Sequence, residues 1–213
     1  MKKGVPAWLL ILIIFVMVCV GVVLFLFRGV TIQGTVTDAI TNAPVKGASV
    51  TIGALSATSD ENGRFKLRVP KLEGELVVNA YGYEPLSVAV EKNPVISLVP
   101  LPEKVADYWF NYWKNGDYER MFELLTNDCR NSITKEAFAE EFSRYKLEIV
   151  AVRAQRTGGE GDSAEVKAEV DINTPFGKQT LHFTIPLKKD FGIWKVVWYS
   201  GGTGVASPQY LVE

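Results

Sequence analysis

The feature that most constrains this chain is an uncharged, strongly apolar stretch near its start. No charged residue occurs from Gly4 to Phe27. The 21 residues from Ala7 to Phe27 are long enough, at about 1.5 Å of rise each, to cross a hydrocarbon layer roughly 30 Å thick as a helix. Backbone groups in lipid must bond within their own segment, and no interior proline prevents that here. The sequence therefore predicts a transmembrane helix over residues 7–27.

The charges beside this stretch predict its orientation. Lys2 and Lys3 precede it and only Arg28 follows closely, and the cytoplasmic side of a membrane protein usually carries the excess of basic residues. We therefore expect residues 1–6 to form a short cytoplasmic tail, and the bulk of the chain to be extracytoplasmic. The protein would then be a single-pass protein of the cell membrane that contacts lipid through residues 7–27. A cleaved signal peptide is the alternative, but its apolar region would be shorter and would end in small residues rather than in LFLFR.

Beyond Arg28 the chain is weakly acidic. All 24 Asp and Glu residues lie there with 20 of the 23 Lys and Arg residues, so this part has a net charge of −4. A protein that binds nucleic acid usually presents a strongly basic surface. The composition therefore argues against nucleic acid as a partner.

Residues 30–100 show the pattern of short β-strands separated by turn-forming residues. Apolar and small residues alternate with polar ones in five segments, and each segment would bury one face of a strand. The alternating positions are Ile32, Gly34, Val36; Ala48, Val50, Ile52; Phe65, Leu67, Val69; Leu76, Val78, Ala80; and Leu86, Val88, Val90. Their spacing predicts a small antiparallel β-sandwich without helices.

The order of motifs in this region resembles a known family. The segments GTVTDAITNAPVKGASVTI, SATSDENGRFKLRVP and LVVNAYGYEP follow one another, as they do in the carboxypeptidase regulatory-like domain. The resemblance implies an all-β, transthyretin-like sandwich of seven strands with Greek-key connections. Such domains recur in exported proteins as non-catalytic binding, spacing or stabilising modules.

The loop Asp60-Glu61-Asn62-Gly63 looks superficially like a calcium site. An EF-hand loop would need a carboxylate at its twelfth position, which is Lys71 here. We therefore expect a hairpin turn in which Asn62 or Gly63 takes a positive φ. One histidine and two cysteines cannot supply a tetrahedral zinc site either, so no metal and no cofactor are predicted.

Residues 103–200 change from helical periodicity to alternation. Apolar residues recur at helical spacing in three groups: Val105, Trp109, Tyr112, Trp113; Met121, Leu124, Leu125; and Phe138, Phe142, Tyr145. Thr134 precedes the third group and is predicted to be the N-cap of its helix. Alternating positions follow at Leu147, Ile149, Ala151; Ala164 to Ile172; Leu181 to Leu187; and Trp194, Val196, Trp198. Helices followed by a sheet predict an α+β domain. Residues 201–213 are expected to form a flexible C-terminal tail.

The segments ADYWFNYWKNGDYERMFELLT, SITKEAFAEEF and IWKVVWYS are similar to the nuclear transport factor 2-like fold. They resemble in particular small exported domains that precede the transpeptidase of some penicillin-binding proteins. The resemblance implies an α+β cone, in which helices pack on a curved antiparallel sheet. It does not imply one function, because the superfamily contains both enzymes and binding modules.

The mouth of such a cone can hold a small apolar ligand, and aromatic residues are available to line it. The candidate pocket residues are Trp109, Trp113, Phe138, Phe142, Phe183, Trp194 and Trp198. The same side chains would serve equally well as core, because each large aromatic buries roughly 150 to 250 Å². Both interpretations stay open from the sequence.

No catalytic residue is predicted. His182, the only histidine, shares a strand face with threonines and is expected on the solvent side. Ser132 and Lys135 have the S-x-x-K spacing of a penicillin-binding active site, but its Ser-Asp-Asn and Lys-Thr-Gly elements are missing. Cys129 would be the one cysteine outside the membrane, and we expect it to be buried.

The sequence therefore predicts a non-enzymatic, extracytoplasmic binding or interaction protein of the cell envelope. Its partner would be another envelope protein, a glycan or a second copy of the chain. One alternative is a receptor or enzyme that uses the cone for a small apolar molecule. The other is a structural spacer in a membrane complex.

Overall fold

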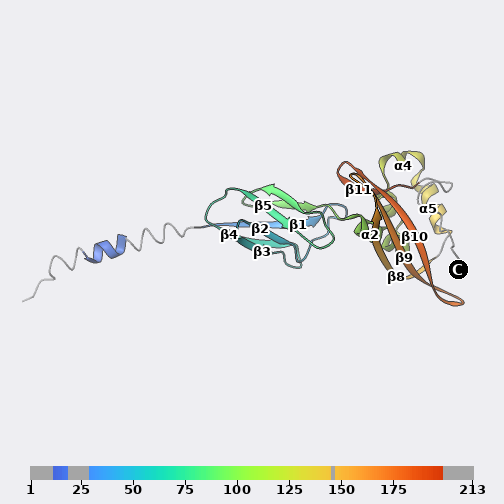
Figure 1. Cartoon of the computed structure of the whole chain (residues 1–213), viewed down its shortest axis with the longest axis horizontal. Helices are drawn as coiled ribbons and strands as arrows, with labels where there is room; N and C mark the ends of the chain where they lie inside the picture. Colours follow the sequence, from blue (N-terminus) through green and yellow to red (C-terminus); the bar gives the residue numbers. More distant parts are fainter. Residues whose placement is uncertain (1–11, 19–28, 145–146, 199–213) are drawn as a thin grey trace, which may run out of the picture. The chain divides into compact units, whose positions relative to one another are not determined.

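The computed structural model describes residues 12–18, 29–144 and 147–198 (Figure 1). Residues 12–18 are helical, and within the described ranges no helix has both the length and the apolar character needed to cross a membrane. Most of the span predicted over residues 7–27 lies outside the described residues. The predicted tails over residues 1–6 and 201–213 lie outside them as well.

The chain divides into two compact units. Of the described residues, the first unit contains those up to Thr37 together with 43–80 and 85–96, and the second contains 38–42, 81–84 and those from Ser97 onward. Residues 38–42 and 81–84 therefore belong to the second unit, although they lie within the sequence range of the first. They supply one of its buried polar clusters.

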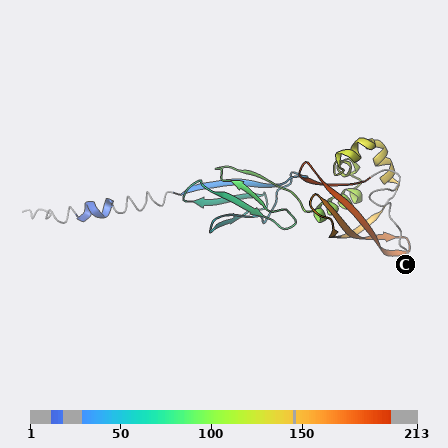
Figure 2. The same cartoon turned by 45° about the horizontal axis from the view of Figure 1, so that its top comes forward.

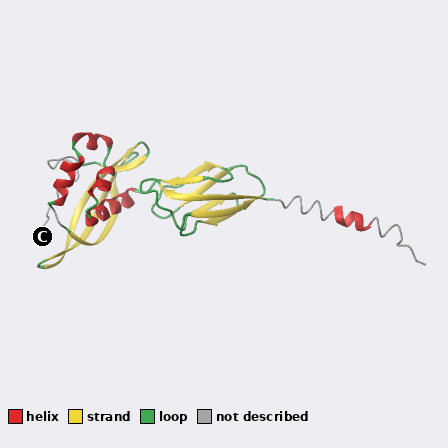
Figure 3. Ribbon diagram, turned by 180° about the vertical axis from the view of Figure 1, so that it is seen from behind, coloured by secondary structure: helices red, strands yellow, loops and turns green. Residues whose placement is uncertain are grey.

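Seven strands and no helix occupy residues 29–101 (Figure 3). One sheet has the order β4-β1-β7 and the other has the order β3-β2-β5-β6. The strands are β1 (Val30–Asp38), β2 (Ser49–Ile52), β3 (Leu55–Thr58), β4 (Arg64–Val69), β5 (Glu75–Asn79), β6 (Leu86–Ala89) and β7 (Val95–Leu98). The sandwich-like arrangement expected from the alternation is thus confirmed.

Period-two burial forms the core of this unit. In β4 the side chains of Phe65, Leu67 and Val69 are buried while the residues between them are exposed. The register pairs Leu67 with Ile32 of β1, which is fully buried too. Because each such side chain contributes about 1.5 to 3 kcal/mol when removed from water, shifting the register by one residue would expose the whole apolar set.

The loop at Asp60 is a turn, as expected, but not a hairpin. Gly63 has a φ of 71° and Asp60 Oδ1 accepts hydrogen bonds from the N–H groups of Asn62 and Arg64. A Cβ atom on Gly63 would lie 2.3 Å from the carbonyl oxygen of Val36. The hairpin prediction was wrong because β3 and β4 belong to different sheets, and the turn carries the chain from one to the other.

In its described residues, the second unit has four helices followed by a four-stranded sheet of order β11-β10-β9-β8. The elements are α2 (Pro102–Asn115), α3 (Tyr118–Glu123), α4 (Asn127–Ser132), α5 (Lys135–Ser143), β8 (Glu148–Gly158), β9 (Ser163–Thr174), β10 (Gly177–Asp190) and β11 (Ile193–Val196). The helices lie to one side of the sheet, as both Figure 2 and Figure 3 show. The predicted α+β arrangement is therefore confirmed.

Two helix boundaries follow from local chemistry. Helix α2 has Pro102 in its first turn and ends at Gly116, whose φ of 68° suits glycine at a helix C-terminus. Helix α5 is capped by Thr134, whose hydroxyl accepts a hydrogen bond from the Ala137 N–H, as predicted. Helix α4 was not predicted, because it is one short turn with a single buried residue, Cys129, and so has no apolar period.

Candidate binding surfaces

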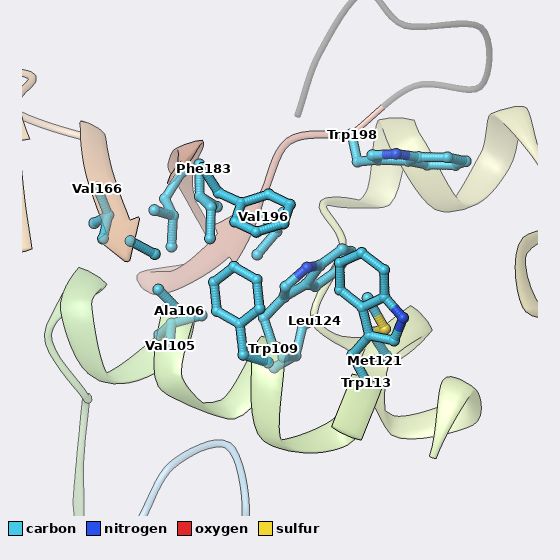
Figure 4. Packing of buried hydrophobic residues seen from close by; sticks show 14 of the residues in the cluster. Val105, Ala106, Trp109, Trp113, Met121, Leu124, Val166, Phe183, Val196 and Trp198 are labelled. Carbon is cyan, nitrogen blue, oxygen red and sulfur yellow. The ribbon is translucent and has the colours of Figure 1, made fainter. Parts of the chain in front are cut away.

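The seven predicted pocket residues are all buried, with exposed fractions of at most 8%. Six of them form a network of ring contacts in the cone, with centroid separations from 4.6 Å for Phe138–Phe142 to 6.1 Å for Trp113–Phe183. Figure 4 shows Trp109 and Trp113 rising from α2 toward Phe183, Val196 and Trp198. The rings therefore occupy the space that an apolar ligand would need.

Trp194, the seventh residue, is held by polar contacts instead. Its indole N–H donates to Glu84 Oε1 at 2.7 Å, and Lys189 Nζ lies 2.9 Å from the same oxygen. The ammonium of Lys189 also sits 5.1 Å from the centre of the Trp194 ring. All polar groups in this contact are paired, which indicates a structural role.

A second buried cluster surrounds Asp38, which is 1% exposed. Its carboxylate accepts hydrogen bonds from the N–H groups of Ile40 and Thr41 at 2.8 Å, from the Tyr83 hydroxyl at 2.9 Å and from the Tyr108 hydroxyl at 2.5 Å. A buried carboxylate is tolerated only when it is paired in this way. The cluster joins three segments of the second unit that are distant in sequence.

The titration of this cluster follows from its burial. Burial by itself would raise the pKa of Asp38, but the hydrogen bonds from Tyr108, Thr41, Ile40 and Tyr83 outweigh it and hold the pKa below its usual value. Burial and the neighbouring Asp38 charge raise the pKa of Tyr83 to about 12. The carboxylate is therefore charged and the Tyr83 phenol protonated over the physiological range, which is the combination the hydrogen bonds require.

The outer face of the β8–β9–β10 sheet, opposite the helices, is polar and hollowed. A depression of about 820 Å³ lies over it, with Arg153, Gln155, Lys167, His182 and Thr184 among its lining residues. In the register His182 lies beside Glu169, and Glu169 lies beside Arg153. The face thus presents both signs of charge with hydroxyl and amide groups in regular rows.

Asp171 organises one end of this face. It accepts two hydrogen bonds from the Arg153 guanidinium, at 3.0 and 3.1 Å, and one from the Thr180 hydroxyl, while Lys178 lies 3.0 Å away. The guanidinium first, then Thr180 and Lys178, hold the pKa of Asp171 far below its usual range. These contacts fix the direction of Arg153, and a fixed planar guanidinium is well suited to polar recognition.

Exposed phenylalanines stand at both ends of β10. Phe176 and Phe191 occupy the two-residue turns on either side of this strand, with exposed fractions of 95% and 91%. Phe191 has a φ of 50°, a left-handed conformation that costs a side-chain residue about 1 to 2 kcal/mol. Phe191 and Gly192 both have a positive φ, as the two central residues of a type I′ hairpin turn do.

The sheet edges are poorly suited to strand addition. The β11 edge is covered by the segment that follows α3. The Val196 N–H donates a hydrogen bond to the Leu124 carbonyl, and the Thr126 N–H donates one to the Val196 carbonyl. The β8 edge carries Arg153 and Arg156 and has two register irregularities. Charges and bulges of this kind block pairing with another strand, so the face is the better candidate for a partner than the edge.

The predicted placements of His182 and Cys129 are confirmed. His182 is exposed. Ser132 donates its hydroxyl to the Cys129 carbonyl while Lys135 pairs with Glu119 and Glu123, so the two residues have separate structural partners. Cys129 is fully buried, and its sulfur accepts hydrogen bonds from the Thr126 hydroxyl and the Trp198 N–H.

Burial of Cys129 predicts slow thiol chemistry. In a Cys19→Ala background, maleimide should react with Cys129 at least about 100-fold more slowly in the native protein than in 6 M guanidinium, because reaction requires local opening. Mass spectrometry of timed samples measures both rates. Equal rates, or a Cys129-linked dimer on non-reducing electrophoresis, would contradict the buried position.

Sequence reasoning missed the outer-face residues Arg153 and Asp171 and the exposed Phe176 and Phe191. A local signal existed for Phe191, because Phe191-Gly192 separates two alternating segments at a two-residue spacing. No comparable signal existed for Arg153. Its partners on β9 are fixed only by the register.

Two families match the chain. Residues 31–97 match the carboxypeptidase regulatory-like domain, and residues 101–202 match the NTF2-like N-terminal transpeptidase domain. Both resemblances predicted from the motifs are thereby confirmed. No curated protein matches the chain.

Three solved structures show weaker likenesses. A SEC-C motif containing protein from Rhodopseudomonas palustris is 14% identical over 45% of this chain and 73% of its own, with a TM-score of 0.38. The helical cell shape determining protein Pgp2 from Campylobacter jejuni is 9% identical over 79% and 92%, with a TM-score of 0.32. A protein of unknown function from Bacteroides fragilis is 14% identical over 79% and 93%, with a TM-score of 0.28. Scores this low do not indicate a shared function.

Proposed function

Because the chain contains a carboxypeptidase regulatory-like domain followed by an NTF2-like N-terminal transpeptidase domain, we propose that it is a membrane-anchored binding protein of the cell envelope without catalytic activity. The two families indicate an extracytoplasmic, envelope-type protein. The anchor is residues 7–27, and the ligand is another envelope protein or a glycan. The binding surface is the outer face of the β8–β9–β10 sheet.

The anchor is supported by the apolar segment itself. All seven residues from 12 to 18 are apolar, and all are exposed on the helix that they form. A helix that is apolar all round requires an apolar environment on every side. The uncharged run from Gly4 to Phe27 extends this character to the length that a bilayer requires.

The observation that carries the binding function is the contrast between the two faces of the second sheet. The inner face is filled by aromatic rings in contact, whereas the outer face is open, hollowed and lined by ordered polar groups. Ligand sites combine a concave surface with a few well-placed polar groups. The outer face has this combination, and two exposed phenylalanines flank it.

A photocrosslinking experiment in the native cells tests the assignment. A benzoylphenylalanine at Gln155, inside the depression, should give a covalent adduct upon illumination, and mass spectrometry of that adduct identifies a protein or a glycan. The same group at Lys114, which is exposed on α2, is the matched control. Arg153→Ala should reduce the yield of the Gln155 adduct by about tenfold. Loss of the polar contact between Arg153 and the ligand should weaken the binding free energy by about 1.4 kcal/mol, which corresponds to a tenfold change in affinity.

Adducts of equal yield at both positions would count against the outer face as the binding surface. The position of the protein in the cell is tested separately by fractionation. Recovery of the intact, untrimmed chain in the aqueous fraction would overturn the anchor.

A further inference from the structure

The sheet β4-β1-β7 of the first unit has a basic outer face. Arg64, Lys66 and Arg68 alternate with the buried residues of β4 and all three are exposed. Since residues two apart on a strand share a face, they form a row about 13 Å long. This row is called the basic row below.

On the same sheet, the outward positions beside the basic row are uncharged. The register places Thr35, Gln33 and Thr31 of β1 beside Arg64, Lys66 and Arg68, and the exposed positions of β7 are Val95 and Ser97. No acidic residue occupies an outward position on these three strands. The one acidic residue that lines the same depression is Asp60, whose Oδ1 accepts hydrogen bonds from backbone N–H groups of its own turn.

The other sheet of the same unit has the opposite character. Strands β2, β3, β5 and β6 contain no basic residue, and their one acidic residue, Glu75, accepts a hydrogen bond from the Ser87 hydroxyl. The positive charge of the strands is therefore confined to one face. This segregation is notable because the chain beyond Arg28 carries an overall charge of −4.

The basic face is shallow and open rather than a closed site. A depression of about 900 Å³ lies over it, lined by Gln33, Thr35, Arg64, Lys66 and Val95 among others. Val95 is 79% exposed beside the charged residues. Long, exposed cationic side chains around an apolar residue suit a broad anionic surface with apolar material beneath it.

The register also fixes which end of the basic row is nearest the predicted anchor. Arg68 pairs with Thr31, and only three residues separate Thr31 from Phe27, a reach of about 14 Å at most. We propose that the β4-β1-β7 face of the first unit docks on the anionic phospholipid headgroups of the membrane that holds the chain. This proposal rests on the proposed anchor at residues 7–27.

Lipid headgroups fit this face better than a soluble anion does. No buried polar group converges in the depression to define a small ligand, and the three cations are spread along a row. Headgroups move laterally and can match such a row. The anchor supplies the proximity, so weak attraction is sufficient to hold the face against the membrane.

Lysine footprinting of the full chain in nanodiscs tests the proposal. The protein is reconstituted in pure phosphatidylcholine or with 30% phosphatidylglycerol, and acylation of individual lysines is followed by mass spectrometry. Lys66 should react at least about fivefold more slowly with phosphatidylglycerol present, because each cation near an anionic surface contributes about 1 kcal/mol, or roughly fivefold. Lys114 and Lys167 of the second unit are exposed controls and should not change.

Two further conditions identify the interaction as electrostatic. In 1 M NaCl, where screening acts within about 3 Å, the protection of Lys66 should disappear. In the Arg64→Gln/Arg68→Gln variant the protection should also be lost in low salt, since both substitutions lie on the exposed side of β4 and leave its buried side chains unchanged.

The outcomes separate this proposal from the proposed function. Incorporation into nanodiscs with equal Lys66 rates in both lipids overturns the docking and leaves the anchor intact. Protection of Lys66 by soluble polyphosphate but not by phosphatidylglycerol overturns it in favour of a soluble polyanion. Failure of the chain to incorporate at all overturns the anchor and the docking together.

Discussion

Replacing Trp109 by alanine should lower the free energy of unfolding of the second unit by about 3 to 5 kcal/mol. Trp109 is 1% exposed, and its ring makes edge contacts with Phe138 at 6.0 Å and with Phe142 at 5.5 Å. These partners lie on another helix, so the substitution leaves a cavity where α2 and α5 meet. Guanidinium unfolding of the full chain in detergent, followed by far-ultraviolet circular dichroism, measures the change.

Phe176→Ala is the matched control for this prediction. It also removes a large aromatic ring from the second unit, but from a turn where the side chain is 95% exposed. The unfolding free energy should change by no more than about 0.5 kcal/mol. If Trp109→Ala were as mild as Phe176→Ala, the ring network could not be the core of the unit.

Replacing Asp38 by alanine should have a similarly large effect through loss of polar pairing. The substitution leaves the Tyr83 and Tyr108 hydroxyls and the N–H groups of Ile40 and Thr41 without their shared acceptor. Unsatisfied buried donors cost about 1 to 3 kcal/mol each, partly relieved by rearrangement. We expect a loss of about 3 to 5 kcal/mol in the unfolding free energy of the second unit.

The pH dependence gives this prediction a distinct signature. The folded pKa of Asp38 lies below its ordinary value, so the stability from its carboxylate is fully present above the unfolded pKa of about 3.9 and is lost as the pH falls through the lower folded value. The stability difference between native protein and Asp38→Ala should therefore be constant from about pH 5 to 7. It should shrink below about pH 4.

The Asp60→Ala variant is the control for Asp38→Ala. It measures the stability lost when an exposed turn carboxylate, rather than a buried one, is removed. Asp60 also accepts two backbone hydrogen bonds at 2.8 Å, but its side chain is exposed. Its removal should cost about 1 kcal/mol, the usual loss for an exposed capping contact. Equal losses for Asp38→Ala and Asp60→Ala would show that the buried cluster adds nothing to stability.

Much of the fold followed from the sequence because its signals are local. Alternation in Phe65, Leu67 and Val69 fixes which face of β4 is buried, whatever the strand pairs with. Thr134 marks the start of a helix through a contact within a few residues. Features of this kind need no knowledge of distant parts of the chain.

The candidate sites depended on contacts that the sequence does not encode locally. Asp38 was visible as part of a motif, but its partners Tyr83 and Tyr108 lie 45 and 70 residues away. The seven aromatics were predicted as a set, yet whether they line a pocket or fill it depends on how closely α2, α5 and the sheet approach one another. The turn at Gly63 was placed correctly, but only the pairing of β3 and β4 in separate sheets excluded a hairpin.

By itself, the sequence determined the apolar stretch, the two domain families and the inward face of most strands, because periodicity and turn chemistry act over a few residues. Only the tertiary structure decided that the aromatic rings of the cone contact one another, that Arg153 is fixed by Asp171 and that the basic row lies beside uncharged residues of β1. The physical reason is that strand register and helix packing bring together residues whose separation along the chain carries no signal of their contact.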